Sequence, residues 1–285
     1  MKLSIIIVNW NTEDLLKQTL DSVFKETKNF DFEVIVVDNN SMKDDSVKMI
    51  KENFPQVVLI ENKENLGFSR ANNQGLKIAK GEYLMLLNSD VIVLNQAIEK
   101  LVGFLDKHPE THMAGPKLLN KDMTFQHACR RGVPDPLNSL FYLTGLHKIF
   151  KNAKIDSYKK FNVSENESGR TEALSGAAMM FRREVYEKIG GLDENFFMYG
   201  EDLDFCKRVL DMGWRTFYVS EAEIIHFYGS SSAKRKMKSL INFYDAMWLY
   251  YKKHFYSKNN IVFNVVIWAS IRAKLFFTLF LNLWK

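Results

Sequence analysis

The sequence predicts an α/β fold in which a mostly parallel sheet is flanked by helices. Four apolar runs of strand length, at 3–8, 32–37, 57–60 and 83–87, alternate with segments of helical length. Runs that are apolar on both faces are typical of parallel strands covered by helices on both sides. The strand–helix alternation from the first residues onward also indicates right-handed crossovers between neighbouring strands.

The other elements follow from spacing and composition. The first helix is expected over 14–25, where apolar residues recur at helical spacing. Residues 115–170 contain three of the five prolines and a polar stretch, and we expect loops and short helices that lie over the site. A second ordered block is expected over 173–232, followed by a basic and aromatic tail over 233–285.

The composition of this 285-residue chain excludes several classes of protein. With 46% hydrophobic residues it can bury a core, and 14 glycines and five prolines are too few for a collagen-like or low-complexity chain. Cys129 and Cys206 cannot form a disulfide framework, and neither has a neighbour at zinc-ligand spacing. No secretory leader precedes the first strand, so we expect a cytoplasmic protein.

The net charge of +5 is unevenly distributed. Residues 231–285 hold ten basic residues and one acid, a net charge of +9, whereas the remaining 29 basic and 33 acidic residues sum to −4. A basic, aromatic tail on a slightly acidic body indicates an anionic surface as the partner of the tail. No RNA- or DNA-binding motif accompanies it, so nucleic acid is not the expected partner.

Each predicted strand is followed by a small polar cluster. These clusters lie at 9–11, 38–41, 61–62 and 88–90. In open α/β sheets, ligands bind beyond the carboxyl ends of the strands. We therefore expect the four clusters to converge on one edge of the sheet and to form the functional site there.

Three charged residues near these strand ends are candidates for ligand binding. Asp90 follows a buried strand and suits a hard divalent cation bound together with phosphates, although for a lone Asp after a strand a turn or cap role is the simpler explanation. Asp38 could accept hydrogen bonds from a nucleoside, or cap a turn. Arg70, early in the helix after Gly67, could pair with a diphosphate or lie in solvent. The turn after the first strand lacks glycines, which argues against dinucleotide binding.

The segment 200–210 allows a geometric argument about its acids. If it is helical, Glu201, Asp204 and Arg208 share one polar face, whereas Asp202 aligns with the apolar residues that are expected to pack inward. Acids in a first helical turn complement the helix dipole, which explains Glu201 better than Asp202. A carboxylate aimed at the interior must be paired or functional. We therefore single out Asp202.

Taken in order, these segments resemble family 2 of the inverting nucleotide-sugar glycosyltransferases, which have the GT-A fold. The resemblance is carried by residues 4–12 (SIIIVNWNT), 36–41 (VVDNNS), 65–73 (NLGFSRANN) and 86–90 (LLNSD). The C-terminal half adds 175–183 (SGAAMMFRR), 189–204 (IGGLDENFFMYGEDLD), His226 and 229–230. The match spans about residues 3–232 and is most similar to bacterial rhamnosyltransferases.

The resemblance implies a GT-A domain over 1–232, with a nucleotide-binding half at about 1–114 and an acceptor-side half at about 115–232. It implies Asp202 as the catalytic base and Asp90 and His226 as the site of a divalent cation, Mg²⁺ or Mn²⁺. The implied donor-binding residues are Val8, Asn9, Trp10, Asp38, Arg70, Asn88 and Ser89. The implied acceptor-side residues are Gly176, Tyr199 and Glu201. Asn88–Asp90 occupies the Asp-X-Asp position of the family with a single acid.

The implied reaction moves a sugar, rhamnose, from a nucleoside-diphosphate sugar to a hydroxyl of a cell-surface glycan or lipid-linked acceptor. It is a single displacement in which Asp202 removes the hydroxyl proton and the cation at Asp90 stabilises the leaving diphosphate. The single acid at the metal position keeps a non-catalytic nucleotide-sugar-binding or scaffold protein open as the alternative. A nucleotidyltransferase is disfavoured because no Gly-rich basic loop follows the first strand.

The tail combines a basic cluster at 233–238 with an apolar segment at 261–285 that is long enough to span a bilayer. Arg272 and Lys274 lie in its middle, where each would cost about 2.5–3.5 kcal/mol at the bilayer centre. A narrow polar stripe at i, i+4, i+8 and i+12 comprises Ser270, Lys274, Thr278 and Asn282. We expect an amphipathic helix at the inner face of the plasma membrane. The alternative is a helix packed on the body or on a second subunit of a homodimer.

Overall fold

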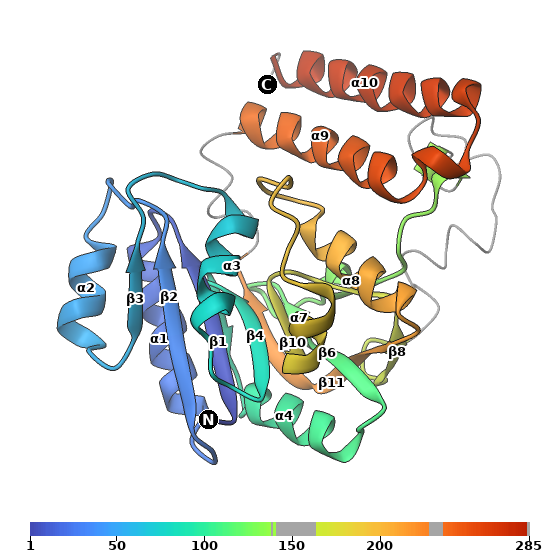
Figure 1. Ribbon diagram of the computed structural model, residues 1–285. Coiled ribbons are helices and arrows are strands. Elements are labelled where there is room, and N and C mark those ends of the chain that lie inside the picture. Colours follow the sequence, from blue (N-terminus) through green and yellow to red (C-terminus); the bar gives the residue numbers. More distant parts are fainter. Residues whose placement is uncertain (138, 141–163, 228–235, 284–285) are drawn as a thin grey trace.

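The computed structural model describes residues 1–137, 139–140, 164–227 and 236–283, and Figure 1 shows their arrangement. A central sheet has the strand order β3-β2-β1-β4-β10-β6-β11-β5, with β8 paired to β11. Its strands are β1 (Leu3–Asn9), β2 (Phe32–Asp38), β3 (Val58–Glu61), β4 (Tyr83–Asn88), β5 (Val91–Val93), β6 (Thr111–Leu119), β8 (Gly169–Thr171), β10 (Ala178–Arg182) and β11 (Arg215–His226). A separate ribbon pairs β7 (Arg130–Arg131) with β9 (Ala173–Leu174).

Eight α-helices are described around these strands. They are α1 (Glu13–Glu26), α2 (Ser46–Asn53), α3 (Phe68–Ile78), α4 (Ala97–Lys107), α7 (Arg183–Ile189), α8 (Glu201–Asp211), α9 (Lys236–His254) and α10 (Ile261–Leu283). Two short 3-10 helices, η1 (His127–Cys129) and η4 (Tyr256–Lys258), are also described. The four predicted strands and the first helix are confirmed to within one or two residues at each end.

The sheet is mixed, and its first four strands are parallel. β1 pairs in parallel with β2 and β4, and β2 pairs in parallel with β3. β10 is antiparallel to both β4 and β6, so this strand from the second half of the chain lies between two strands of the first half. The predicted α/β fold with a mostly parallel sheet and C-terminal helices is confirmed.

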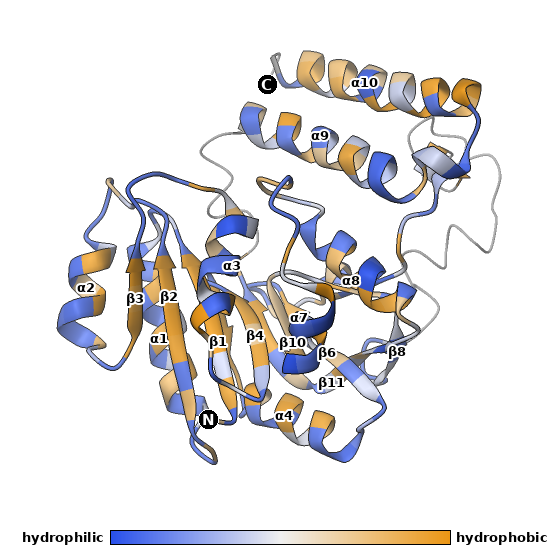
Figure 2. Cartoon of the chain, viewed as in Figure 1, coloured by the Kyte–Doolittle hydropathy of each residue, from blue (hydrophilic) through white to orange (hydrophobic). Residues whose placement is uncertain are grey.

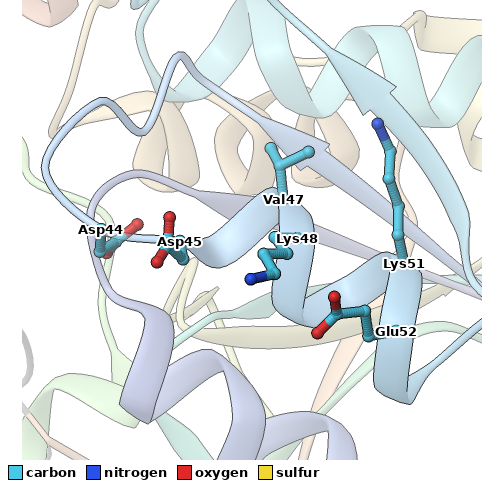
Figure 3. Close-up of a pocket in the computed structure, with 6 residues that line it drawn as sticks. All are labelled: Asp44, Asp45, Val47, Lys48, Lys51 and Glu52. Carbon is cyan, nitrogen blue, oxygen red and sulfur yellow. The ribbon is translucent and has the colours of Figure 1, made fainter.

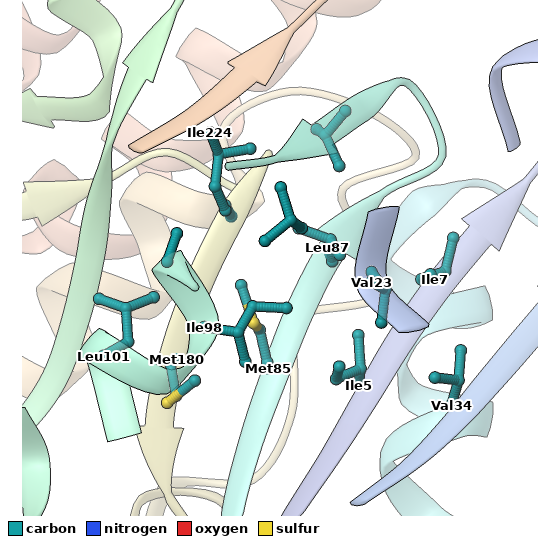
Figure 4. Packing of buried hydrophobic residues seen from close by; sticks show 14 of the residues in the cluster. Ile5, Ile7, Val23, Val34, Met85, Leu87, Ile98, Leu101, Met180 and Ile224 are labelled. Atoms are coloured by element: carbon teal, nitrogen blue, oxygen red, sulfur yellow. The ribbon is translucent and has the colours of Figure 1, made fainter. Parts of the chain in front are cut away.

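The core forms two apolar layers, one on each face of the sheet, because successive side chains of a strand point to opposite faces. In β1, Ile5 and Ile7 lie in the layer under α1, α2 and α4, whereas Ile6 lies in the layer under α3, α7 and α8. Figure 4 shows the first layer, where Val23 of α1 and Ile98 of α4 lie over Ile5 and Met85. Burial on both faces explains why the strands read as continuous apolar runs.

The segment predicted to be irregular contains a sheet strand, β6, and this corrects the expectation of loops from residue 115 onward. β6 carries Pro116, which has no N–H to donate to a neighbouring strand. Proline is tolerated there because pairing with β10 ends at Ala114, and pairing with β11 becomes irregular after Val219. The proposed boundary between the two halves, at about residue 114, therefore falls inside a strand. Residues 141–163 of the predicted irregular segment lie outside the described residues.

The tail forms an antiparallel helical hairpin of α9 and α10, which lies beside α8 in Figure 1. Tyr244 and Thr278 hydroxyls lie 3.0 Å apart, and Tyr251 donates to Asn264 at 2.5 Å. Because the earlier residue of α9 contacts the later residue of α10, the two helices run in opposite directions. Most of α10 is hydrophobic (Figure 2). The first residues of the predicted basic cluster, 233–235, lie outside the described part of the chain.

Candidate active site

The four polar clusters at the strand ends are joined by hydrogen bonds, as the sequence predicts. Asn9, after β1, donates from Nδ2 to Oδ1 of Asp38 at 2.9 Å. Asn62 donates from Nδ2 to Oδ1 of Asn39 at 3.0 Å, which links the ends of β2 and β3. The hydroxyls of Thr12 and Ser89 lie 3.0 Å apart, and this contact adds the end of β4. The carboxyl ends of all four strands therefore meet at one edge of the sheet.

Asp38 is buried at this edge, and both of its carboxylate oxygens are engaged within the protein. Oδ1 accepts from Asn9, and Oδ2 accepts from the backbone N–H of Ser41 at 2.9 Å. Through this second bond Asp38 caps the turn after β2, which is one of the two roles that the sequence analysis left open for it. Asp38 therefore shapes the loop after β2, and its contact with a donor nucleoside stays a prediction.

Asp90 and His226 come together although 136 positions separate them. β11 pairs antiparallel with β5, which places His226 opposite Val91. The His226 Nε2 atom lies 3.5 Å from Oδ1 of Asp90 and 3.3 Å from Nδ2 of Asn88. The two predicted metal-site residues are thus neighbours, and both are buried.

The chemistry of this cluster fits a divalent cation. It offers a carboxylate, an imidazole nitrogen and Oδ1 of Asn88, a buried acceptor with no hydrogen-bond partner among the described residues. No three His, Cys, Asp or Glu side chains in the described part of the chain are placed so that they could hold a metal ion by themselves. A cation held here would therefore complete its coordination with substrate oxygens, as Mg²⁺ does when it is bound through few carboxylates and phosphates.

Asp202 lies in the first turn of α8 and accepts three hydrogen bonds. Its Oδ2 accepts from Gly176 N–H at 3.1 Å and from the Arg131 guanidinium at 2.5 Å. Its Oδ1 accepts from the N–H of Leu203 at 2.7 Å. The carboxylate is therefore held in one orientation at the turn between β9 and β10.

That same turn connects the two predicted carboxylates. Asn88, at the end of β4, donates from its N–H to the carbonyl oxygen of Ala177 at 2.9 Å, next to Gly176. Gly176 contacts Asp202, and Asn88 contacts His226 beside Asp90. A chain of contacts through the turn at 175–177 and Asn88 therefore links the Asp202 carboxylate to the Asp90–His226 pair at this edge of the sheet.

The structure corrects the expected faces of α8. Glu201 and Asp204, which the sequence places on a polar face, are both buried, whereas Asp202 is half-buried. The reason at Asp204 is the C-terminal hairpin: His254 and Lys253 of α9 contact its Oδ1 at 2.8 and 2.7 Å. The helical pattern of α8 could not reveal this cover, because the covering helix lies some fifty residues later in the chain.

Glu201 is a buried carboxyl beside Asp202. Its Oε2 has no hydrogen-bond partner among the described residues. Burial, and secondly the charge of Asp202, raises the pKa of Glu201 well above its ordinary value. Glu201 therefore favours its neutral form next to the carboxylate that Arg131 and Gly176 hold.

The other predicted residues lie around this edge with different degrees of exposure. Arg70 is 56% exposed, and its Nε lies 3.6 Å from Glu194. Val8 and Trp10 are half-buried at the end of β1. Tyr199 has φ +71°, a left-handed conformation that bulky residues rarely adopt, directly before Gly200 at φ +80°. Such backbone strain clusters at functional sites, where the surrounding packing maintains it.

Two side chains at the site were missed by sequence reasoning. Arg131, in β7, contacts Asp202, and Gln126, before η1, contacts His226 at Nδ1 at 3.0 Å. Both come from the segment that was expected to be irregular. The pair of adjacent arginines at 130 and 131 could have marked Arg131 as a candidate, whereas nothing in the local sequence marks Gln126.

A shallow hollow of about 410 Å³ lies elsewhere, at the start of α2 (Figure 3). It is lined by Asp44, Asp45, Val47, Lys48, Lys51 and Glu52. None of these residues belongs to the strand-end clusters, so we do not assign the site to this hollow.

Solved structures with the same fold include several glycosyltransferases. The mannosyltransferase PcManGT from Pyrobaculum calidifontis, in complex with GDP-Man and Mn²⁺, has a TM-score of 0.61 at 18% identity and covers 96% of this chain and 69% of its own. GalNAc-T7 with UDP, GalNAc and Mn²⁺ has a TM-score of 0.62 at 21% identity, with 90% and 50% covered. At these identities the likeness establishes the GT-A fold.

Curated relatives show similarity along most of the chain. It is 29% identical over 240 residues to O-antigen biosynthesis protein RfbC of Myxococcus xanthus, which covers 81% of this chain and 18% of that protein. It is 25% identical over 248 residues to an N-acetylglucosaminyl-diphospho-decaprenol L-rhamnosyltransferase of Mycobacterium tuberculosis, with 81% and 78% covered. It is 24% identical over 233 residues to dTDP-rhamnosyl transferase RfbF of Shigella flexneri, with 80% and 70% covered. The chain thus spans less than a fifth of the length of RfbC.

Family profiles complete these comparisons. The profile described as "N-terminal domain of galactosyltransferase" matches residues 160–230. The profile described as "Glycosyl transferase family 2" matches residues 4–190, more than half of the chain and all four strand-end clusters. The chain therefore belongs to glycosyl transferase family 2.

Proposed function

We propose that this protein transfers a sugar from a nucleoside-diphosphate sugar to a hydroxyl group, with inversion at the anomeric carbon. The observation that carries the proposal is the position of the 175–177 turn. Its Gly176 N–H bonds to the Asp202 carboxylate, and its Ala177 carbonyl oxygen accepts from Asn88, whose side chain contacts His226 beside Asp90. One side then suits the attacking hydroxyl and the other suits the leaving diphosphate.

Asp202 would accept the proton of the acceptor hydroxyl as its oxygen forms a bond to the anomeric carbon. The bond from that carbon to the diphosphate breaks in the same step, and the nucleoside diphosphate leaves with the electron pair. Asp90, His226 and Asn88 would hold the divalent cation, Mg²⁺ or Mn²⁺, which neutralises charge on the diphosphate when bound. The hydrogen bonds from Arg131 and Gly176 keep the Asp202 carboxylate in one orientation for this step.

The names of two relatives favour rhamnose as the sugar and a cell-surface glycan or lipid-linked molecule as the acceptor. One is an L-rhamnosyltransferase of a diphospho-decaprenol substrate, and the other is a dTDP-rhamnosyl transferase. Both align with at least four fifths of this chain. A dTDP-rhamnose donor is therefore the first one to test.

The test uses Asp202→Asn, which keeps the shape of the side chain and removes its basicity. We expect turnover to fall by about 10²–10⁴-fold, the usual contribution of a general base. Donor binding, measured by calorimetry with dTDP-rhamnose and Mn²⁺, should remain within a few-fold of wild type. The matched control is Asp211→Asn, at the exposed end of the same helix, which should change neither quantity. Wild-type turnover in Asp202→Asn would remove the base assignment.

A non-catalytic donor-binding protein is the second candidate, because Asn88-Ser89-Asp90 contains a single acid. The same measurements separate the two candidates. Donor binding by the wild type without release of nucleoside diphosphate to any acceptor would favour the binding protein, whereas metal-dependent release favours the transferase.

We also propose that the α9–α10 hairpin contacts the cytoplasmic face of an anionic membrane. Helix α10 is long and apolar enough to cross a bilayer by length and composition over Ile261–Asn282, and 17% of that window is buried. Val262, Phe276 and Phe277 are 70%, 66% and 61% exposed. Its charged Arg272 is paired with Asp245 of α9 at 2.6 Å, so the hairpin partly compensates this charge. The exposed apolar side chains and the positive tail together suit anionic lipid.

Vesicle co-sedimentation tests this contact. The full chain should bind vesicles containing phosphatidylglycerol, bind phosphatidylcholine vesicles less, and lose affinity as salt rises. The double variant Phe276→Ser and Phe277→Ser should reduce binding strongly. The variant Met42→Ser, at an even more exposed apolar residue on the body, should not. The opposite result would be a wild type that does not bind vesicles and is dimeric by light scattering, with a double variant that is monomeric. That result would mean that α10 packs against a second subunit instead.

A further inference from the structure

We propose that Gln126 is a positioning residue that fixes the imidazole of His226, so that its Nδ1 carries the hydrogen and its Nε2 faces Asp90. The inference rests on the proposed cation site, because it assigns a role to a residue behind that site. Nothing in the local sequence marks Gln126, which precedes η1 in the segment between β6 and β7.

The side-chain amide of Gln126 has a fixed orientation. Its Nε2 lies 2.7 Å from the His226 carbonyl oxygen, 2.9 Å from Oδ1 of Asn120 and 3.3 Å from the Leu119 carbonyl oxygen. All three neighbours are acceptors. Rotation of the amide by half a turn would place Oε1 against three oxygens, so the nitrogen must lie on this side.

The opposite end of the amide then determines the histidine tautomer. Oε1 of Gln126 lies 3.0 Å from Nδ1 of His226 and can only accept. Nδ1 must therefore donate, which means that Nδ1 carries a hydrogen. In the neutral ring, Nε2 is then the nitrogen with the lone pair, and it lies toward Asp90 and Asn88.

The backbone around Gln126 keeps this contact in place. A tight turn after β6 has Asn120 N–H bonded to the Thr124 carbonyl oxygen at 2.7 Å, and the N–H of Gln126 bonds to the Leu118 carbonyl oxygen at 2.9 Å. Leu119 and Phe125 also pair as an isolated antiparallel β-bridge within the same turn. Gln126 is buried, so its amide cannot exchange these partners for solvent without opening the turn.

This arrangement matches what a metal-binding histidine requires. A ligating histidine normally donates its other N–H to a second group, which fixes both the tautomer and the ring orientation, and loss of that group weakens metal binding by about 10–100-fold. Gln126 occupies that position relative to His226. It does not contact substrate or cation in this scheme, and it acts through the histidine.

The first experiment reads the tautomer directly. Nitrogen-15 NMR of the wild type without metal should show His226 with hydrogen on Nδ1. Gln126→Met, which keeps the volume and removes the acceptor, should move the ring toward the tautomer with hydrogen on Nε2. A wild-type ring with hydrogen on Nε2 would overturn the proposal, whatever the fate of the variant.

The second experiment is a double-mutant cycle on Mn²⁺ affinity, measured by calorimetry in the presence of a nucleoside diphosphate. Gln126→Met should weaken Mn²⁺ binding by about 10–100-fold in the wild type and have no further effect in the His226→Ala background. Gln18→Met, an exposed glutamine on α1, is the control and should leave the affinity unchanged.

The outcomes separate this inference from the proposed function. An equal loss of Mn²⁺ affinity in both backgrounds would mean that Gln126 acts only on the fold, and the positioning role would be wrong. A wild type that binds no Mn²⁺ at all would remove the proposed cation site, while the tautomer measurement would still decide whether Gln126 orients His226.

Discussion

Two adjacent carboxyl groups, at Glu201 and Asp202, have opposite surroundings at the residue scale. Asp202 accepts three hydrogen bonds, including one from Arg131. Glu201 is buried, with Oε2 lacking a partner among the described residues. A neutral Glu201 avoids a second negative charge next to the proposed base, and in this form it can remain in the interior.

The raised pKa of Glu201 predicts a pH-dependent stability difference. Between its ordinary pKa of 4.5 and the raised value, the folded state holds a proton that the unfolded chain releases, so wild-type stability falls as pH rises through this window. Glu201→Gln lacks this loss. The melting temperature of Glu201→Gln minus that of the wild type should therefore increase by several degrees between pH 5 and pH 8.

Differential scanning fluorimetry across that pH range checks this prediction. Glu187→Gln, an exposed carboxylate on α7, is the control and should follow the wild type at each pH. A difference between Glu201→Gln and wild type that is the same at pH 5 and pH 8 would show that the carboxyl does not hold a proton in the folded state.

At the scale of elements, the junction of α8 and α9 connects the proposed base to the C-terminal hairpin. Asp204, two residues after Asp202, is fully buried and contacts Arg208 of its own helix at 2.9 Å as well as Lys253 and His254 of α9. These partners, with the hydrogen bond from His254 first, outweigh burial and lower the pKa of Asp204 to about 2. Ala246 and Tyr250 of α9 also pack against Phe196. The hairpin therefore covers one side of α8, the helix that carries the proposed base.

Removal of the Asp204 carboxylate should destabilise the protein strongly. Asp204→Asn leaves Arg208 and Lys253 without the buried carboxylate that balances their charge, and we expect a loss of about 3 kcal/mol in urea unfolding near neutral pH. Because the folded pKa is lowered, the stabilisation is present above the ordinary value of 3.8 and disappears as pH falls toward 2.

The same helix supplies the comparison. Lys207 and Asp211 form an ion pair at i, i+4 with an exposed carboxylate, so Asp211→Asn should cost about 0.5 kcal/mol or less. Equal losses in the two variants would mean that the junction between α8 and α9 contributes no more than a surface pair.

At the scale of the whole molecule, one sheet contains strands from both proposed halves of the catalytic domain. β10 lies between β4 and β6 and pairs with both, so Met180 is opposite Met85 on one side and Ala114 on the other. Ile6 of β1 and Phe181 of β10 belong to the same apolar layer. The two halves therefore share a core, and neither can lose its packing alone.

This shared core predicts a single cooperative unfolding transition of the sheet. Ile6→Ala and Phe181→Ala remove buried side chains from different halves, and each should lower stability by about 2–5 kcal/mol. Hydrogen exchange should then accelerate in β1 and β10 together in both variants. Exchange that rises only in the half that carries the substitution would show that the halves unfold separately.

The sequence by itself determined that helices cover both faces of the sheet, which four segments of the first half are strands, and that their polar ends meet at one edge. Strands that are apolar on both faces must be covered by helices on both sides of the sheet. Because parallel strands end at the same edge, the polar residues that follow them lie together there. Asn9, Asp38, Ser89 and Asp90 were found in this way, because their positions follow from local pattern and strand direction.

Only the tertiary structure decided which partners these residues have. The sequence did not predict β6 because the strand contains Pro116. A proline fits there only because the pairing of β6 with β10 ends before it, at Ala114. The inward faces of Glu201 and Asp204 depend on cover that the pattern of α8 does not encode. Arg131 reaches Asp202 across 71 positions, and Gln126 reaches His226 across 100. Such contacts arise when distant segments pack together, and a local sequence pattern can mark a residue such as Arg131 but cannot identify its partner.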